Sequence, residues 1–92
     1  MYEPKLFGVE PDKQTSPHGA TYVWDRGSVD VEIDKVFNAG WWEIDVCFDG
    51  VEDDYVNHKE PTLEKAVEYA EGKIREHHKI LSLMIDGGRD GN

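Results

Sequence analysis

The chain has 92 residues, of which 20 are acidic and 10 are basic, so its formal net charge at pH 7 is −10. This length suits one small domain, and a hydrophobic content of 38% with three tryptophans is enough for a core, which excludes a disordered chain. The single cysteine excludes an internal disulfide, and the lack of a secretory signal or a long apolar segment leads us to expect a cytoplasmic protein with no membrane association.

The acidic residues are concentrated in the middle of the chain. Residues 25–60 contain eleven acidic and three basic side chains, whereas the remaining residues contain nine acidic and seven basic ones. A general requirement for solubility would spread the charge along the chain, so this concentration indicates one acidic surface. Direct binding to nucleic acid is disfavoured, because phosphate contacts require clustered lysine and arginine side chains.

The N-terminal segment, residues 1–19, contains three prolines and two glycines, which excludes a helix and predicts an irregular arm. Its apolar residues Leu6, Phe7 and Val9 are available to attach the arm to the core. Residues 20–87 are then expected to form a single α+β domain, and residues 88–92 a flexible tail.

Three segments after the arm have the composition or the alternation of strands. Residues 20–25 are rich in β-branched and aromatic side chains, and apolar and acidic residues alternate through 29–34 and again through 41–48. Residues 54–58 are a weaker candidate. Because turn residues separate these segments, the sequence predicts an antiparallel meander of three to four strands.

A helix follows the strands. Pro61 and Thr62 are typical of a helix start, with Thr62 as the N-cap. Apolar residues then recur at helical spacing as Leu63, Ala66, Val67, Ala70, Ile74, Leu81 and Ile85, before the Gly87–Gly88 pair that ends the pattern. The predicted fold is therefore an α+β meander with one long C-terminal helix packed on one face.

The predicted helix is longer than the sheet beneath it. Residues 63–85 span about 35 Å as a helix, whereas a strand of this protein spans about 20–27 Å. Leu81, Met84 and Ile85 lie in the overhanging part, where an apolar surface needs a cover. We expect either the N-terminal arm or a second copy in a two-fold dimer, so the protein is a monomer or a homodimer.

The alternation in the two central strands places acidic residues on one face. If Val29, Val31 and Ile33 face the helix, then Asp30, Glu32 and Asp34 point outward, and so do Glu43 and Asp45 on the next strand. A short connection sets Asp34 opposite Glu43 and Glu32 opposite Asp45, with Asp30 opposite Cys47. Like charges in these positions repel one another.

Three interpretations of this acidic face stay open: a solvated surface, a docking site for a basic partner, or a site for a divalent cation near Asp49, Glu52, Asp53 and Asp54. The spacing of those four residues does not fit a Ca²⁺-binding loop. Trp41 falls on the same face, where it is either exposed as an interface anchor or covered by the arm. On the first strand, either Tyr22 and Trp24 or their neighbours face the core.

The sequence contains no catalytic motif. Structural zinc requires two closely spaced pairs of ligands, and the chain offers one cysteine with His18, His58, His77 and His78 at unsuitable spacing. The paired carboxylates lie on an open face rather than in a cleft, and no glycine-rich phosphate loop precedes a helix. We expect no enzyme activity, no bound metal and no cofactor.

The sequence thus predicts a small acidic binding protein, an inhibitor or modulator that docks its acidic hairpin on a basic surface of a partner protein. That surface is a candidate nucleic-acid-binding site, which the acidic hairpin would occupy as a nucleic-acid mimic. The alternative is a structural or assembly domain that associates with itself through the end of its C-terminal helix.

Overall fold

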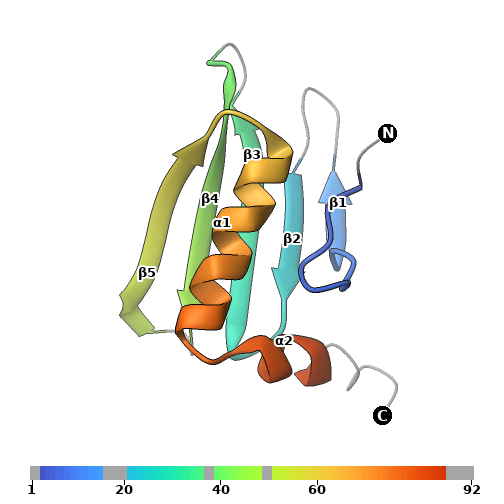
Figure 1. The fold of residues 1–92 in the computed structure, drawn as a ribbon, viewed down its shortest axis with the longest axis vertical. Coiled ribbons are helices and arrows are strands. Elements are labelled where there is room, and N and C mark those ends of the chain that lie inside the picture. The colour runs from blue at the N-terminus through green and yellow to red at the C-terminus, as the bar shows by residue number, and fades with distance from the viewer. Residues whose placement is uncertain (1–2, 16–20, 37–38, 49–50, 87–92) are drawn as a thin grey trace.

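The computed structural model describes residues 3–15, 21–36, 39–48 and 51–86. In chain order they form strands β1 (Lys13–Thr15), β2 (Thr21–Asp25), β3 (Val29–Val36), β4 (Trp41–Phe48) and β5 (Val51–Glu60), then helices α1 (Leu63–Glu76) and α2 (Ile80–Asp86). The strands make one antiparallel sheet in the order β1-β2-β3-β4-β5, and α1 runs across one of its faces (Figure 1). The α+β class and the antiparallel meander are confirmed, but the sheet has five strands rather than three to four.

The N-terminal arm is part of the fold, and the prediction that residues 1–19 are irregular is wrong for residues 13–15. These residues form β1 and pair with β2. Leu6 is fully buried in the core. The Leu6 and Val9 backbones exchange two hydrogen bonds, and Phe7 and Gly8 between them both have positive φ, as in a tight hairpin turn.

One face of the sheet and one side of α1 enclose the core. The alternation predicted which residues of β3 and β4 are buried, and Val29, Val31, Ile33, Ile44, Val46 and Phe48 are all fully or almost fully buried. On β2 the open choice is resolved, because Trp24 is fully buried and Tyr22 packs against the core. Helix α1 packs mainly on β4, with further contacts to β3 and β5.

Strand β5 is longer than the sequence suggested. It covers residues 51–60, whereas only 54–58 were expected. Its pairing with β4 changes register between Val46 and Phe48, so the side-chain alternation of a regular strand is interrupted there. The strand therefore lacks the continuous apolar–polar alternation by which β3 and β4 were recognised.

Helix α1 starts as predicted. Thr62 is the N-cap, and its hydroxyl oxygen accepts a hydrogen bond from the Lys65 N–H at 3.1 Å. Four residues of the expected apolar stripe are buried against the sheet, namely Ala66, Val67, Ala70 and Ile74.

The single long helix is wrong, because the chain leaves the helical path after Glu76. His77 is the C-cap, and His78 has a φ of 56°, in the left-handed region. The His78 N–H donates to the Arg75 carbonyl at 3.0 Å, and the Lys79 N–H donates to the Ile74 carbonyl at 2.9 Å. These two bonds form the Schellman motif that ends many helices, usually at a glycine.

The break also changes which residues of the second helix are buried. Of the three residues expected under a cover, Leu81 is 69% exposed and Met84 is 48% exposed, while the side chain of Ile85 lies outside what the structure describes. Leu83 is fully buried instead. A helix of 14 residues is about 21 Å long, which matches the strands, so the overhang does not exist.

Within the described residues, no helix is both long and apolar enough to cross a lipid bilayer. The Gly87–Gly88 pair and the expected tail, residues 88–92, lie outside the described part of the chain.

Candidate functional site

The sheet face opposite α1 carries the carboxylates that the sequence analysis singled out. We define the acidic face by six residues of β2, β3 and β4: Asp25, Asp30, Glu32, Asp34, Glu43 and Asp45. The predicted register is confirmed, with Asp34 opposite Glu43, Glu32 opposite Asp45, and Asp30 opposite Cys47. The carboxylates predicted from the two central strands therefore lie together on one side of the sheet.

Asp25 is a member of the acidic face that the sequence analysis missed. It lies directly opposite Asp30 across the β2–β3 pair. The connection is a tight turn in which Gly27 has a φ of 80° and the Arg26 N–H donates to the Val29 carbonyl at 3.0 Å. Arg26, Gly27 and Ser28 separate the two predicted strands, and counting outward from them would have found the pair, because a two-residue loop fixes the register.

The crowding of these carboxyl groups changes the titration of Asp30. Burial raises its pKa from 3.8 to about 6, helped by a hydrogen bond to the Asp25 carboxyl and by that group's negative charge. A backbone hydrogen bond from Arg26 acts in the opposite direction. A hydrogen bond between two carboxyl groups needs a proton, so this contact favours the protonated form of Asp30.

Glu32 is perturbed in the same way by its neighbours. A hydrogen bond to the Asp34 carboxyl, burial, and the charges of Asp34 and Asp45 raise its pKa from 4.5 to about 7. The acidic face therefore loses negative charge below neutral pH and approaches its full charge above it.

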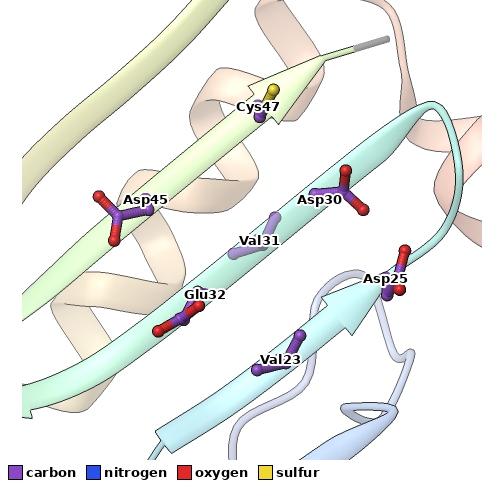
Figure 2. Close-up of a pocket in the computed structure, with 7 residues that line it drawn as sticks. All are labelled: Val23, Asp25, Asp30, Val31, Glu32, Asp45 and Cys47. Carbon is purple, nitrogen blue, oxygen red and sulfur yellow. The ribbon is translucent and has the colours of Figure 1, made fainter. Parts of the chain in front are cut away.

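A shallow depression of about 280 Å³ lies in the middle of this face (Figure 2). Figure 2 shows Asp25, Asp30, Glu32 and Asp45 around it on three neighbouring strands, with the helix on the far side of the sheet. Val23 and Cys47 contribute an apolar and a thiol surface to its lining. Such an open acidic depression is suited to a cationic side chain lying on an apolar patch.

Trp41 is the first residue of β4 and lies opposite Val36 of β3. It is 39% exposed. By strand alternation it shares the face of Glu43 and Asp45. The arm therefore leaves a substantial part of this ring accessible. Tryptophan is enriched among the residues that carry binding energy at protein interfaces, so Trp41 is a candidate contact residue on this face.

The edge of the acidic face towards β5 is less acidic. Lys59 lies opposite Glu43, and the Asn57 side-chain amide donates a hydrogen bond to the Asp45 carboxylate. Lys59 and Asn57 therefore offset part of the negative charge of Glu43 and Asp45 at this edge.

The remaining candidate residues lie away from the acidic face. Leu81 and Met84 are on α2, which follows α1 in the chain. Helix α1 covers the sheet face opposite the acidic face (Figure 1). His58 stacks on Tyr69 at 3.8 Å between ring centroids, and His77 stacks on Phe48 at 4.0 Å. In the described part of the chain, no three histidine, cysteine or carboxylate side chains are arranged to hold a metal ion.

Comparison of the chain with protein-family models, with curated proteins and with solved structures finds no match in any of the three.

Proposed function

We propose that this protein is a cytoplasmic inhibitor or modulator that docks its acidic face on a basic surface of a partner protein. The observation that carries the proposal is the set of three directly opposed acidic pairs on one sheet face. They are Asp25 with Asp30, Glu32 with Asp45, and Asp34 with Glu43.

These pairs are unfavourable for the free domain. Like charges directly opposite each other across a sheet destabilise it by a few tenths of a kcal/mol per pair. Solubility alone is served as well by mixed charges, which avoid this repulsion. A partner with lysine and arginine side chains offsets the repulsion, so the arrangement is favourable in a complex.

The most specific form of the proposal is that the partner surface normally binds nucleic acid. Alternate carboxylates along one strand stand about 6.6 Å apart. This spacing is comparable to that of phosphates along a nucleic-acid strand, and Asp30, Glu32 and Asp34 make such a row. A basic site that recognises a phosphate backbone would accept this row in place of it, without any chemistry or cofactor from the acidic protein.

Trp41 supplies the second element of the proposed interface. Charge directs the encounter between two proteins, but a desolvated aromatic ring slows their separation. Because Trp41 lies on the face that carries the acidic pairs, one partner surface can contact both.

A second candidate is an assembly domain that associates with itself through its C-terminal helix. The exposure of Leu81 and Met84 on α2 favours it, since large apolar side chains at a helix end suit a contact with another molecule. In that case the acidic face serves only solubility.

The test is the capture of partners from an extract of the native host with tagged wild-type protein and two matched variants. One variant, Glu32→Gln with Asp45→Asn, removes two charges from the acidic face. The control, Glu64→Gln with Glu68→Gln, removes two charges from exposed positions of α1. Mass spectrometry identifies what each form retains.

We expect the wild type and the helix control to retain the same basic protein, and the acidic-face variant to lose most of it. Added nucleic acid should displace that protein from the wild type. Equal capture by both variants would show that the acidic face is not the functional surface.

A further inference from the structure

The described part of the N-terminal arm, residues 3–15, lies beside β2 and ends in β1 (Figure 1). We call these residues the strap. Leu6 is fully buried in the core, and Phe7 and Val9 pack against it. Elsewhere, a hollow of about 290 Å³ is lined by strap residues together with Tyr22 of β2. The strap therefore does not pack on the sheet along its whole length.

Asp12 binds the strap to β2 and to the turn that follows it. Its Oδ1 forms an ion pair with Nη2 of Arg26 at 3.0 Å, and its Oδ2 accepts a hydrogen bond from the Asp25 N–H at 2.8 Å. The Asp12 N–H donates to the Val23 carbonyl at 2.7 Å. Nη2 of Arg26 also donates to the Glu10 carbonyl at 3.1 Å. Both of these partners of the Arg26 guanidinium belong to the strap.

The two members of the ion pair differ in their access to water. The side chain of Arg26 is 7% exposed, whereas that of Asp12 is 25% exposed. The Nε of Arg26 is buried and has no hydrogen-bond partner among the described residues. A buried charge that loses its partner costs more free energy than an accessible one, because the accessible group regains water. Arg26 therefore depends on Asp12 more strongly than Asp12 depends on Arg26.

Trp24 of β2 lies at the contact between the strap and the core. Its ring is fully buried, and its indole N–H donates to the Val9 carbonyl at 2.8 Å. The strap contributes Leu6 to the core cluster, and the other members of that cluster lie on β2, β3, β4 and the two helices. Movement of the strap therefore uncovers the Trp24 indole N–H and leaves most of the core in place.

We propose that the strap opens as a unit, without unfolding of the rest of the sheet, and that the Arg26–Asp12 ion pair holds it closed. Opening removes both strap partners of Arg26 and gives its guanidinium access to water, so an unpaired Arg26 favours the open state. The same movement separates β1 from β2, whose outer edge can then pair with another strand. It also removes the Asp12 contact from Asp25 of the acidic face. The inference does not depend on the function proposed for that face.

The test is native-state hydrogen exchange, followed by NMR at a series of urea concentrations below the unfolding transition. The Asp12 backbone N–H and the Trp24 indole N–H report on the strap, because each donates across the contact between the strap and β2. The backbone N–H groups of β4, which is paired on both sides, report on the sheet. We expect the two strap protons to share one opening free energy and to depend less on urea than the β4 protons, because strap opening exposes less surface than unfolding does.

Three variants and a control test the ion pair. Asp12→Asn leaves the buried Arg26 without its charged partner, so it should lower the protection of the strap protons about 10-fold or more. Arg26→Met breaks the same pair but leaves only the more accessible Asp12 carboxylate, so the loss of protection should be much smaller. Asp12→Asn with Arg26→Met should recover most of the protection. The control, Glu76→Gln, breaks the Lys73–Glu76 ion pair on α1 and should not affect the strap protons.

Three outcomes would overturn the proposal. Strap protons that exchange with the β4 protons at every urea concentration would show that the strap opens only when the whole domain unfolds. A loss of protection in Arg26→Met as large as that in Asp12→Asn would show that the buried charge of Arg26 does not control opening. A loss in Asp12→Asn that the double variant does not recover would assign the effect to the contact of Asp12 with the Asp25 N–H.

Discussion

Glu32 shows how strongly single residues are coupled on the acidic face. It has Asp34 two residues along its own strand and Asp45 opposite on β4, and these neighbours raise its pKa from 4.5 to about 7. The pKa of Asp30 rises from 3.8 to about 6 through burial and Asp25. Between the unfolded and folded pKa values the folded state binds more protons, so this contribution to stability is complete below about pH 4 and is lost as the pH rises to about 7.

The first prediction follows from this loss of stability with rising pH. Glu32→Gln removes the ionisation and its repulsion, so it should stabilise the protein by about 0.5 kcal/mol at pH 8 and by much less at pH 4. Glu68→Gln on α1, an exposed carboxyl, is the control and should show no such difference. Urea unfolding at the two pH values measures both. A gain from Glu32→Gln that is the same at both pH values would show that Glu32 is not perturbed by its neighbours.

At the residue scale, the sequence predicted most of the acidic face because alternation carries the information. A shift of one residue would bury Asp30 and Glu32 and expose Val31, so only one assignment is physically acceptable. Asp25 was missed because its strand, β2, does not alternate clearly between apolar and charged residues. The turn after it, rather than alternation, carries the information that sets it opposite Asp30.

At the element scale, the end of α1 is where sequence reasoning failed. Apolar spacing continues past His78, and the usual glycine is absent, so periodicity predicted an uninterrupted helix. The break depends on a histidine in the left-handed region, which histidine adopts more readily than most residues. Backbone hydrogen bonds of this kind leave no signature in a hydrophobic pattern.

The second prediction concerns two substitutions, one that introduces a glycine at residue 78 and one that replaces the glycine at residue 72. His78→Gly should stabilise the protein by up to about 1 kcal/mol, because glycine has no penalty at positive φ. Gly72→Ala should stabilise it by a similar amount, because the position is helical and an added Cβ meets nothing within 4 Å. Thermal unfolding of each variant measures this. Destabilisation of about 1 kcal/mol by His78→Gly would instead indicate that the helix continues through residue 78.

The N-terminal arm is the other element that the sequence understated. Its apolar residues were expected to attach it, but its backbone also joins the fold: the Asp12 N–H donates to the Val23 carbonyl at 2.7 Å. The Trp24 indole N–H donates to the Val9 carbonyl at 2.8 Å. Prolines identified where a helix was impossible, and they carried no information on the pairing of β1.

The third prediction compares two leucines. Leu6→Ala should destabilise the protein by about 2–5 kcal/mol, because Leu6 is fully buried although it lies in the arm. Leu81→Ala should change stability by less than about 0.5 kcal/mol, because Leu81 is 69% exposed. Chemical denaturation measures both. Equal effects would contradict the placement of the arm in the core and of Leu81 outside it.

At the scale of the whole molecule, the two faces of one sheet have different compositions. One face packs on α1 and contains most of the core, so its composition is fixed by stability. The other face concentrates carboxylates in opposed pairs beside an exposed Trp41 and gains no stability from them. This division leads us to place the function on the acidic face.

The central claim is tested most directly by the association kinetics of the acidic face with its captured partner. The rate constants of the wild type and of Glu32→Gln with Asp45→Asn are measured at low and high salt. The account predicts that the variant is as stable as the wild type or more so, yet associates more slowly and with a weaker salt dependence. Identical association rates at both salt concentrations would contradict it.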